Sequence, residues 1–260
     1  MTTEDMATRR LDPSGFDTDK RRLTHYLDNY ERILSPLRCR SVDLLELGVY
    51  HGGSLLLWQD YFPSGSVTGL DINPVEPDPS SDRIRVYRGE QQDLALLDRI
   101  ARERAPGGFD VIIDDCSHIG APTRISFWHL FRNHLKPGGL FVVEDWGTGY
   151  WPAWPDGAGF RARPGGSGNR LADWFDRIGR RPLSTGIIRL LRRVRRELYP
   201  RRFPSHAHGM VGFIKELVDE CGATDASMPG HGVGPSRRSG IHRLEISHGH
   251  AFIRKADDVA

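Results

Sequence analysis

The sequence predicts an α/β fold in which helices cover both faces of a mostly parallel β-sheet. Three observations support this prediction. Short apolar runs typical of buried strands recur along the chain, and between them lie longer segments whose apolar residues return every three to four positions. Such an alternation of strands and helices is typical of parallel sheets, whose strands are buried on both faces. The third observation is a glycine-rich turn over residues 48–54, placed between the first predicted strand and the helix that follows it.

The first half of the chain alternates regularly between predicted helices and strands. The helices show one apolar face, and Pro36 and Pro63 close the first two of them. In chain order we expect a helix over 18–37, a strand over 42–47, a helix over 52–61, strands over 66–72 and 84–88, and a helix over 93–104.

The second half continues this alternation and then departs from it. The stretch 146–204 is rich in Gly, Pro, Trp and Arg and holds one helical segment, 184–199. We therefore expect a disordered or loosely attached N-terminus over 1–17 and a single domain over 18–260 that includes 146–204 as a variable lid or insertion. The remaining elements are expected as strands over 109–114, 140–144, 241–247 and 250–254, helices over 122–135 and 205–221, and a turn over 136–139.

Composition narrows the classes of function. With 260 residues, of which 38% are hydrophobic, the chain can bury the core of one globular domain. A net charge of +2 disfavours nucleic acid as the main partner. The cysteines, Cys39, Cys116 and Cys221, are too scattered for a disulfide scaffold or a sulfur-ligated metal. Because the N-terminus lacks an apolar signal stretch and no run reaches roughly 18 apolar residues, we expect a cytoplasmic protein without a membrane span.

The glycine turn is the first candidate binding site. Open parallel sheets bind ligands at the carboxyl ends of their strands, and glycine lets the backbone turn sharply and approach a ligand. A dinucleotide-binding turn would carry a glycine two residues after Gly48, where this chain has Tyr50. The spacing found here suits a nucleoside with a methionine tail, as in S-adenosyl-L-methionine, better than a pyrophosphate. The candidate cofactor residues of the turn are Glu46, Gly48, Tyr50 and Ser54.

Three polar residues at later strand ends are further candidates for cofactor binding. Asp71 ends the second strand, where a carboxylate can accept both ribose hydroxyls; its alternative role is to cap a turn. Gln91 follows the third strand, near the expected place of an adenine ring, while its neighbour Asp93 could be a helix N-cap. Asp114 ends the fourth strand and completes this set.

A cluster of acids and one histidine is expected where the fourth and fifth strands end. Asp115 follows one strand, and Glu144 and Asp145 close the other, so their carboxylates should converge and repel one another unless a cation intervenes. Oxygen ligands favour a hard ion such as Mg²⁺. His118 lies within reach and suits proton abstraction near neutral pH. Singly, such residues are often caps or structural hydrogen-bonding groups, but their conjunction predicts a metal site with an adjacent base.

At these residues the chain resembles the mycinamicin-type sugar O-methyltransferases, which methylate deoxysugar hydroxyls on macrolides and related natural products. The resemblance covers roughly residues 19–155 and the two closing strands, and its motifs are specific when taken together. They are Asp19-Lys20, His25-Tyr26, Leu45-Glu46-Leu47-Gly48-Val49-Tyr50, Gly52-Gly53-Ser54-Leu55, Trp58-Gln59-Asp60-Tyr61-Phe62-Pro63, Gly69-Leu70-Asp71-Ile72, Ile113-Asp114-Asp115-Cys116-Ser117-His118, Leu135-Lys136-Pro137-Gly138-Gly139, Glu144-Asp145 and Tyr150-Trp151-Pro152.

The resemblance implies a fold, cofactors and roles for single residues. The fold would be the class I methyltransferase, Rossmann-like sheet, mostly parallel with an antiparallel C-terminal strand and an insertion after the fifth strand. The cofactors would be S-adenosyl-L-methionine and Mg²⁺, the acceptor a small-molecule glycoside, and the assembly a homo-oligomer. Asp115, Glu144 and Asp145 would bind the magnesium ion, and His118 would be the general base for an in-line methyl transfer.

Two departures limit what the resemblance implies. The antibiotic enzymes often carry a further N-terminal domain, for which this chain has no room, and the stretch after Pro152 matches no pattern that would fix the acceptor. A polysaccharide or a catechol-like acceptor therefore remains an alternative. From other classes, a nucleotide-cofactor oxidoreductase and a catalytically idle binding protein remain, although the intact set of acids and histidine speaks against the idle protein.

The insertion carries two further features with open interpretations. Trp146, Trp151 and Trp154 follow the candidate metal ligands, and their rings could stack on sugar or polyketide rings or form a small satellite core. Over 184–199 an apolar stripe lies opposite several arginines. Such a helix could line an interface between subunits, lie on an anionic surface or hold an acidic acceptor, but we favour a solvated helix packed on the domain.

Overall fold

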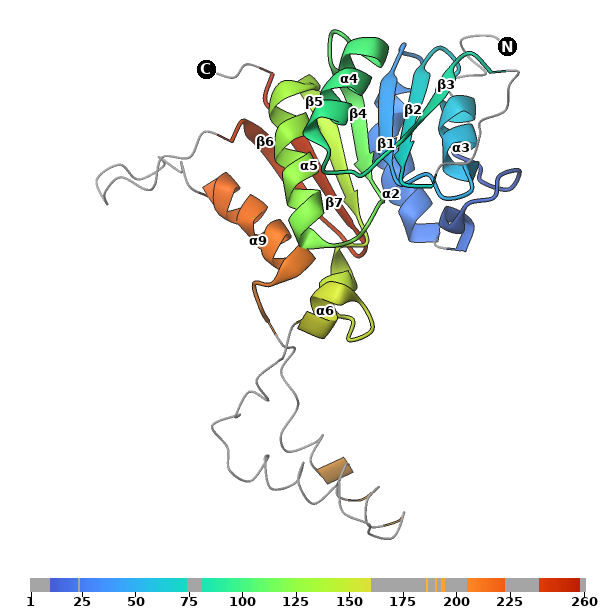
Figure 1. The fold of residues 1–260 in the computed structure, drawn as a ribbon. Helices are drawn as coiled ribbons and strands as arrows, with labels where there is room; N and C mark the ends of the chain where they lie inside the picture. The colour runs from blue at the N-terminus through green and yellow to red at the C-terminus, as the bar shows by residue number, and fades with distance from the viewer. Residues whose placement is uncertain are drawn as a thin grey trace.

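The computed structural model describes residues 10–22, 24–73, 81–159, 205–222 and 239–257, together with Gly186, Leu190, Arg193 and Val194. Within these residues one seven-stranded sheet has the order β3-β2-β1-β4-β5-β7-β6 (Figure 1). Neighbouring strands from β3 to β5 are parallel, and β7 is antiparallel to both β5 and β6, as the sequence predicted. The strands are β1 (Asp43–Leu47), β2 (Ser66–Asp71), β3 (Ile84–Arg88), β4 (Phe109–Asp114), β5 (Leu135–Glu144), β6 (Ile241–Ile246) and β7 (His250–Lys255).

Helices cover both faces of this sheet, and alternate strand residues face each layer. Leu44 packs in one apolar cluster with residues of α2 and α3, whereas its neighbour Leu45 packs in the other with residues of α4, α5 and α9. Figure 1 shows α5 and α9 along the same face. The described helices are η1 (Asp19–Arg22), α2 (Thr24–Leu34), η2 (Ser35–Leu37), α3 (Gly53–Tyr61), α4 (Leu94–Arg104), α5 (Gly120–Asn133), η3 (Trp146–Tyr150), α6 (Pro155–Gly159) and α9 (Gly209–Gly222).

Most predicted elements agree with these bounds to within a few residues, but some ends differ. The helix expected over 18–37 is divided into η1, α2 and η2, and β5 includes the expected turn 136–139 because Leu135 already pairs with Phe109. α5 begins before Pro122, at Gly120, and α9 begins at Gly209 rather than at residue 205. The helical segment expected over 184–199 lies largely outside the described residues.

One buried carboxylate explains where α5 and α9 begin. Asp156 of α6 accepts hydrogen bonds at Oδ2 from the backbone amides of Gly120 (2.8 Å) and Met210 (2.7 Å). It therefore caps the first turn of two helices that are far apart in the sequence. Asp156 lies in the expected insertion. Its hydrogen bond to Gly120 therefore joins the described start of that insertion to α5, the helix that begins two residues after His118.

The N-terminal segment packs on the domain from residue 10 onward. We expected residues 1–17 to be loosely attached, yet Leu11 is buried and its amide donates to Glu31 Oε2 at 2.9 Å. Asp17 lies against Gly53 at the start of α3. Residues 1–9 lie outside the described part. Among the described helices, none combines the length and the apolar character that crossing a lipid bilayer requires.

Candidate active site

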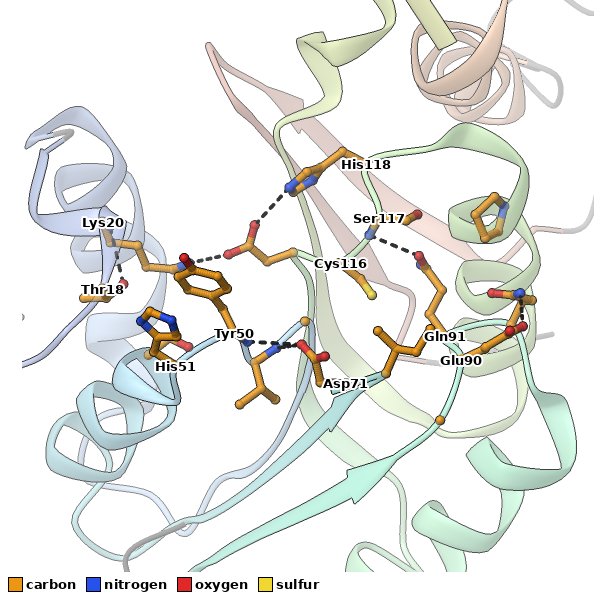
Figure 2. A pocket seen from close by; sticks show the side chains of 18 of the residues that line it. Thr18, Lys20, Tyr50, His51, Asp71, Glu90, Gln91, Cys116, Ser117 and His118 are labelled. Carbon is orange, nitrogen blue, oxygen red and sulfur yellow. Dashed lines mark hydrogen bonds and ion pairs between the residues drawn. The ribbon is translucent and has the colours of Figure 1, made fainter. Parts of the chain in front are cut away.

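A cleft of about 960 Å³ opens at the carboxyl ends of β1 to β4. Its wall consists of the segments that follow these strands and of residues from the N-terminal segment (Figure 2). Four of the predicted site residues lie outside this lining, namely Glu46, Asp114, Glu144 and Asp145. The predicted site residues that line it are Gly48, Tyr50, Ser54, Asp71, Gln91, Asp115 and His118.

The glycine turn forms one side of the cleft, and its glycines are needed for packing. Gly48 has φ +90°, and a Cβ there would lie 2.1 Å from the backbone oxygen of Asp115, so a side chain would push the ends of β1 and β4 apart. A Cβ on Gly53 would lie 1.9 Å from the backbone oxygen of Asp17. Tyr50, at φ +48°, is 77% exposed at this side of the cleft. The glycines therefore allow the turn to pack closely against the backbone of Asp115 and Asp17.

Asp71 lines the cleft and also fixes the glycine turn. Its Oδ2 accepts from the backbone amides of Val49 (2.8 Å) and Tyr50 (3.1 Å), as Figure 2 shows, and its Oδ1 accepts from Asn73 (2.7 Å). The turn-capping role that the sequence left open is thus present. Binding to ribose hydroxyls stays a prediction.

Gln91 and Asp114 join the loops that follow β3 and β4. The Gln91 amide donates to Asp114 Oδ2 at 3.0 Å, and its Oε1 accepts from the Ser117 amide at 3.2 Å. Asp114 is only 2% exposed, and burial raises the pKa of its carboxyl to about 6. Asp93 accepts from the Leu96 amide and is the N-cap of α4. Gln91 therefore faces the cleft with its amide already engaged, while Asp114 supports the wall from behind.

Glu46 lies beneath the turn and stabilises the start of α3. Its fully buried carboxylate accepts from Ser54 Oγ at 2.7 Å and from Trp58 Nε1 at 3.2 Å. Burial raises the pKa of Glu46 to about 7. Glu46 lies on the same face of β1 as Leu44, which packs in one cluster with residues of α2 and α3. The side chain of Glu46 is therefore directed to the layer formed by α2 and α3.

Asp115, His118 and Asp145 converge at the end of the cleft nearest β5. His118 Nε2 lies 3.8 Å from Asp115 Oδ1 and 4.0 Å from Asp145 Oδ2. His118 has φ +50° and Asp145 has φ +51°, and Tyr50 is the third residue other than glycine with positive φ among the described residues. Left-handed backbone is costly outside glycine and concentrates at functional sites. These positions are therefore held by their surroundings.

The surroundings of His118 come from the start of the insertion. Its backbone carbonyl accepts from Thr148 Oγ1 at 2.9 Å and from Trp154 Nε1 at 3.1 Å. Trp146 packs against the core, whereas Trp151 is 54% exposed. The three tryptophans thus have different roles, and Trp154 holds the conformation of His118.

Glu144 lies behind the cleft in a network with buried basic and phenolic groups. Lys20 Nζ lies 3.0 Å from Glu144 Oε1 and 2.8 Å from Asp115 Oδ2. Burial by itself would lower the pKa of Lys20, but Asp115, Glu144 and Glu46 raise it well above its ordinary value, so the amine is charged. Burial in turn raises the pKa of Glu144, with Asp115 acting in the same direction and Lys20 against it. Tyr30 donates to Glu144 from α2.

The donor set suits a hard divalent ion. One ligand atom each from Asp115, His118 and Asp145 lie within 4.8 Å of one another. Mg²⁺ typically takes one or two protein carboxylates and keeps several waters, which two aspartates would permit. The Lys20 ammonium between Asp115 and Glu144 is a fixed positive charge and shows that this region stabilises a cation. The residues therefore fit the predicted metal, with Glu144 set apart from the other two acids.

Comparisons with known proteins agree with this geometry. No protein-family model matches the chain. Over 147 residues it is 43% identical to a mycinamicin VI 2''-O-methyltransferase from Micromonospora griseorubida. The aligned part is 54% of this chain and 36% of that protein. Over 159 residues it is 38% identical to an L-olivosyl-oleandolide 3-O-methyltransferase from Streptomyces antibioticus, covering 58% and 40%. A solved MycE methyltransferase in complex with Mg, SAH and mycinamycin VI has a TM-score of 0.58 and 32% identity, covering 89% of this chain and 49% of that chain.

The strand order and these structural neighbours define a class I methyltransferase fold, as the sequence predicted. The resemblance to sugar O-methyltransferases of macrolide and polyketide biosynthesis is likewise confirmed. The chain spans 36% and 40% of the two curated relatives above and about half of the MycE chain, at 49%.

Several residues that shape the site escaped the sequence reasoning. Tyr26 and Tyr30 donate to Asp145 and Glu144, although the sequence assigns neither of them a role at the site. Lys20 was noted as part of a motif without a role. The available signal was the spacing of these residues, because positions 26 and 30 of one helix share a face.

Proposed function

We propose that this chain is an S-adenosyl-L-methionine-dependent, Mg²⁺-assisted O-methyltransferase that acts on a sugar hydroxyl of a glycosylated natural product. The observation that carries this proposal is the position of His118, whose Nε2 lies 3.8 Å from Asp115 and 4.0 Å from Asp145. Asp115 and His118 line a cleft built on the glycine turn, and Asp145 lies beside them outside its lining. The relatives named above, which are sugar O-methyltransferases by name, support the same chemistry.

The cleft offers distinct surroundings for the two ends of S-adenosyl-L-methionine. Asp71 would accept from the ribose hydroxyls, and the adjoining Ile72, 57% exposed, gives the adenine ring an apolar surface. Gln91 closes the same side of the cleft. The methionine end would lie beside the glycine turn at Gly48, which lines the cleft. Glu46 and Asp114 act from behind the wall by fixing Ser54 and Gln91.

His118 lies beside the candidate metal ligands, and its imidazole can accept the proton of an acceptor hydroxyl. When bound, S-adenosyl-L-methionine would supply the methyl group, and Mg²⁺, with Asp115, Glu144 and Asp145 as candidate ligands, would hold and polarise that hydroxyl. His118 Nε2 would take the proton of that hydroxyl, so that its oxygen could accept the methyl group that the cofactor supplies. The carboxylates of Asp115 and Asp145 stabilise the imidazolium that forms.

The acceptor is the least determined part of the proposal. The exposed ring of Trp151 lies in the segment that anchors His118 and offers a stacking face for a sugar. A polysaccharide or a catechol-like acceptor is the second candidate, and a homo-oligomer is the expected assembly. A panel of macrolide and other glycosides tested against catechols, with transfer measured from labelled S-adenosyl-L-methionine, separates these acceptors. Transfer to catechols alone would exclude the sugar acceptor.

Binding and turnover test the rest of the proposal. S-adenosylhomocysteine should raise the melting temperature, whereas nicotinamide and flavin nucleotides should not; the reverse result would favour an oxidoreductase. His118→Ala should abolish turnover with little loss of stability, while His242→Ala, at an exposed position of β6, is the matched control and should leave turnover unchanged. EDTA should stop transfer and Mg²⁺ should restore it. Full transfer in chelator would remove the metal from the mechanism.

A further inference from the structure

A second cluster of potential metal ligands lies away from the candidate active site. Among the described residues, Asp98, His129 and His134 each offer one ligand atom, and these atoms lie within 4.8 Å of one another. Asp98 comes from α4, His129 from the later part of α5, and His134 is the residue that follows α5. His134 directly precedes β5, which ends at Glu144. The cluster is therefore at the amino end of β5, whereas the cleft opens at the carboxyl ends of the strands.

The two imidazoles of this cluster converge on one carboxylate oxygen. Nε2 of His129 lies 2.7 Å from Asp98 Oδ1, and Nε2 of His134 lies 2.6 Å from the same atom. Hydrogen bonding to His134 and to His129 lowers the pKa of Asp98, so its carboxyl group is ionised, as a metal ligand must be. The side chain of Asp98 is 39% exposed, whereas both imidazoles are largely buried. The cluster is therefore open to solvent on the side of the carboxylate.

Neighbouring residues hold both histidines in place. The backbone amide of His134 donates to the Leu130 carbonyl at 2.8 Å, and its carbonyl accepts from the Phe109 amide at 2.7 Å. His134 is thus fixed both to α5 and to the start of β4. The side-chain amide of Asn133 lies 3.3 Å from His129 Nδ1. An amide can turn its oxygen to accept a proton from that ring nitrogen, which leaves Nε2 free to bind an ion.

We propose that Asp98, His129 and His134 form a second metal site, for a divalent transition-metal ion such as Zn²⁺. The inference does not rest on the proposed function. Two imidazole nitrogens and one carboxylate oxygen are a donor set that suits Zn²⁺, whereas Mg²⁺ favours oxygen ligands. Three protein ligands leave a fourth position of the tetrahedral site for water. The ion would join α4 to the end of α5.

The distances between the ligand atoms require only a small rearrangement. Ligands that bind Zn²⁺ at about 2.0–2.1 Å lie roughly 3.3 Å from one another in a tetrahedral site. Asp98 Oδ1 would therefore move away from His129 Nε2 by roughly 0.6 Å and from His134 Nε2 by roughly 0.7 Å. Because the carboxylate is the exposed member of the cluster, its side chain can make this movement while the histidines stay in place.

The test is a calorimetric titration of the whole chain with Zn²⁺. All variants are made in a His118→Ala parent, because His118 could itself bind Zn²⁺ in the candidate active site. Loss of an outer-shell partner alone costs about 10- to 100-fold in metal affinity, so His129→Gln and His134→Gln should each weaken the tightest Zn²⁺ binding about tenfold or more. His248→Gln is the matched control and should leave the affinity unchanged. Its Nδ1 also faces an imidazole, at 3.3 Å from His25 Nε2, but this pair belongs to no cluster of three potential ligands in the described part of the chain.

Two further measurements separate a metal site from a carboxylate that only accepts hydrogen bonds. Zn²⁺ should raise the melting temperature of the parent but not that of the two histidine variants, because only the parent keeps the complete site. Asp98→Asn retains an oxygen that can accept from both imidazoles but removes the charge, and it should weaken Zn²⁺ binding about tenfold. This variant also decides the case in which a histidine variant does not fold. Equal Zn²⁺ affinity in the parent and Asp98→Asn, or a parent that binds Zn²⁺ no more tightly than Mg²⁺, would overturn the proposal.

Discussion

The anchoring of His118 leads to a prediction that can be worked through in magnitude. Its backbone carbonyl is held by Thr148 Oγ1 at 2.9 Å and Trp154 Nε1 at 3.1 Å, and its backbone has φ +50°. A residue other than glycine in such a conformation carries a cost of about 1–3 kcal/mol. A neutral hydrogen bond contributes about 1 kcal/mol. The two bonds together are therefore comparable to the cost that they offset.

Trp154→Phe and Thr148→Val each remove one of these donors while conserving most of the side-chain volume. A loss of about 1 kcal/mol corresponds to a roughly fivefold change in the population of the anchored conformation, and about 2 kcal/mol to a roughly 30-fold change. We therefore expect kcat to fall about fivefold in each single variant and about 30-fold in the double variant. The dissociation constant of S-adenosylhomocysteine should stay unchanged, because the cofactor side of the cleft is not altered.

The assay is methyl transfer at saturating substrates, with cofactor binding measured separately by calorimetry. Trp128→Phe is the matched control, since its indole donates to Glu216 of α9 at 3.1 Å, and among the described residues no hydrogen bond joins it to His118. A double variant whose kcat stays within twofold of the wild type would refute the reasoning. So would an equal loss in the Trp128 control, because the effect would then be one of general stability.

Three further predictions concern the fold beneath the site. Gly48→Ala places a Cβ 2.1 Å from the Asp115 carbonyl oxygen. It should lower the free energy of unfolding in urea by on the order of 3 kcal/mol and abolish cofactor binding. Gly52→Ala is the control: at φ +81° in open space, it should lower the free energy of unfolding by about 1 kcal/mol. Burial raises the pKa of Glu46 from 4.5 to about 7, so the stability that this gives is full below pH 4.5 and lost as pH rises through 7. Glu46→Gln should therefore match the wild type near pH 4.5 and exceed it at pH 8 by up to about 3 kcal/mol in urea unfolding; a difference independent of pH would contradict this. Asp156→Ala removes the acceptor of two buried helix-terminal amides and should lower the free energy of unfolding by about 3 kcal/mol in a thermal melt; an unchanged melting temperature would exclude the capping role.

Much of the site geometry could be predicted from local sequence patterns. The apolar runs and periodic segments indicate the strands and helices, because burial on both faces of a sheet requires such patterns. Since β4 and β5 are neighbours, residues that directly follow them must lie close together, and Asp115 and Asp145 do so with His118 between them. The left-handed backbone of His118 could not be predicted, because its donors come from residues 148 and 154.

The sequence by itself determined the order of the elements, the glycine turn and which acids stand at the strand ends. Only the tertiary structure decided which of these acids face the cleft, because side chains alternate between the two faces of a strand. Glu144 shares its strand face with Val142 and is directed to the layer of α2, where Tyr30 and Lys20 bind it. Local patterns fix the strand, but the charge placed opposite Glu144 depends on how a distant segment packs.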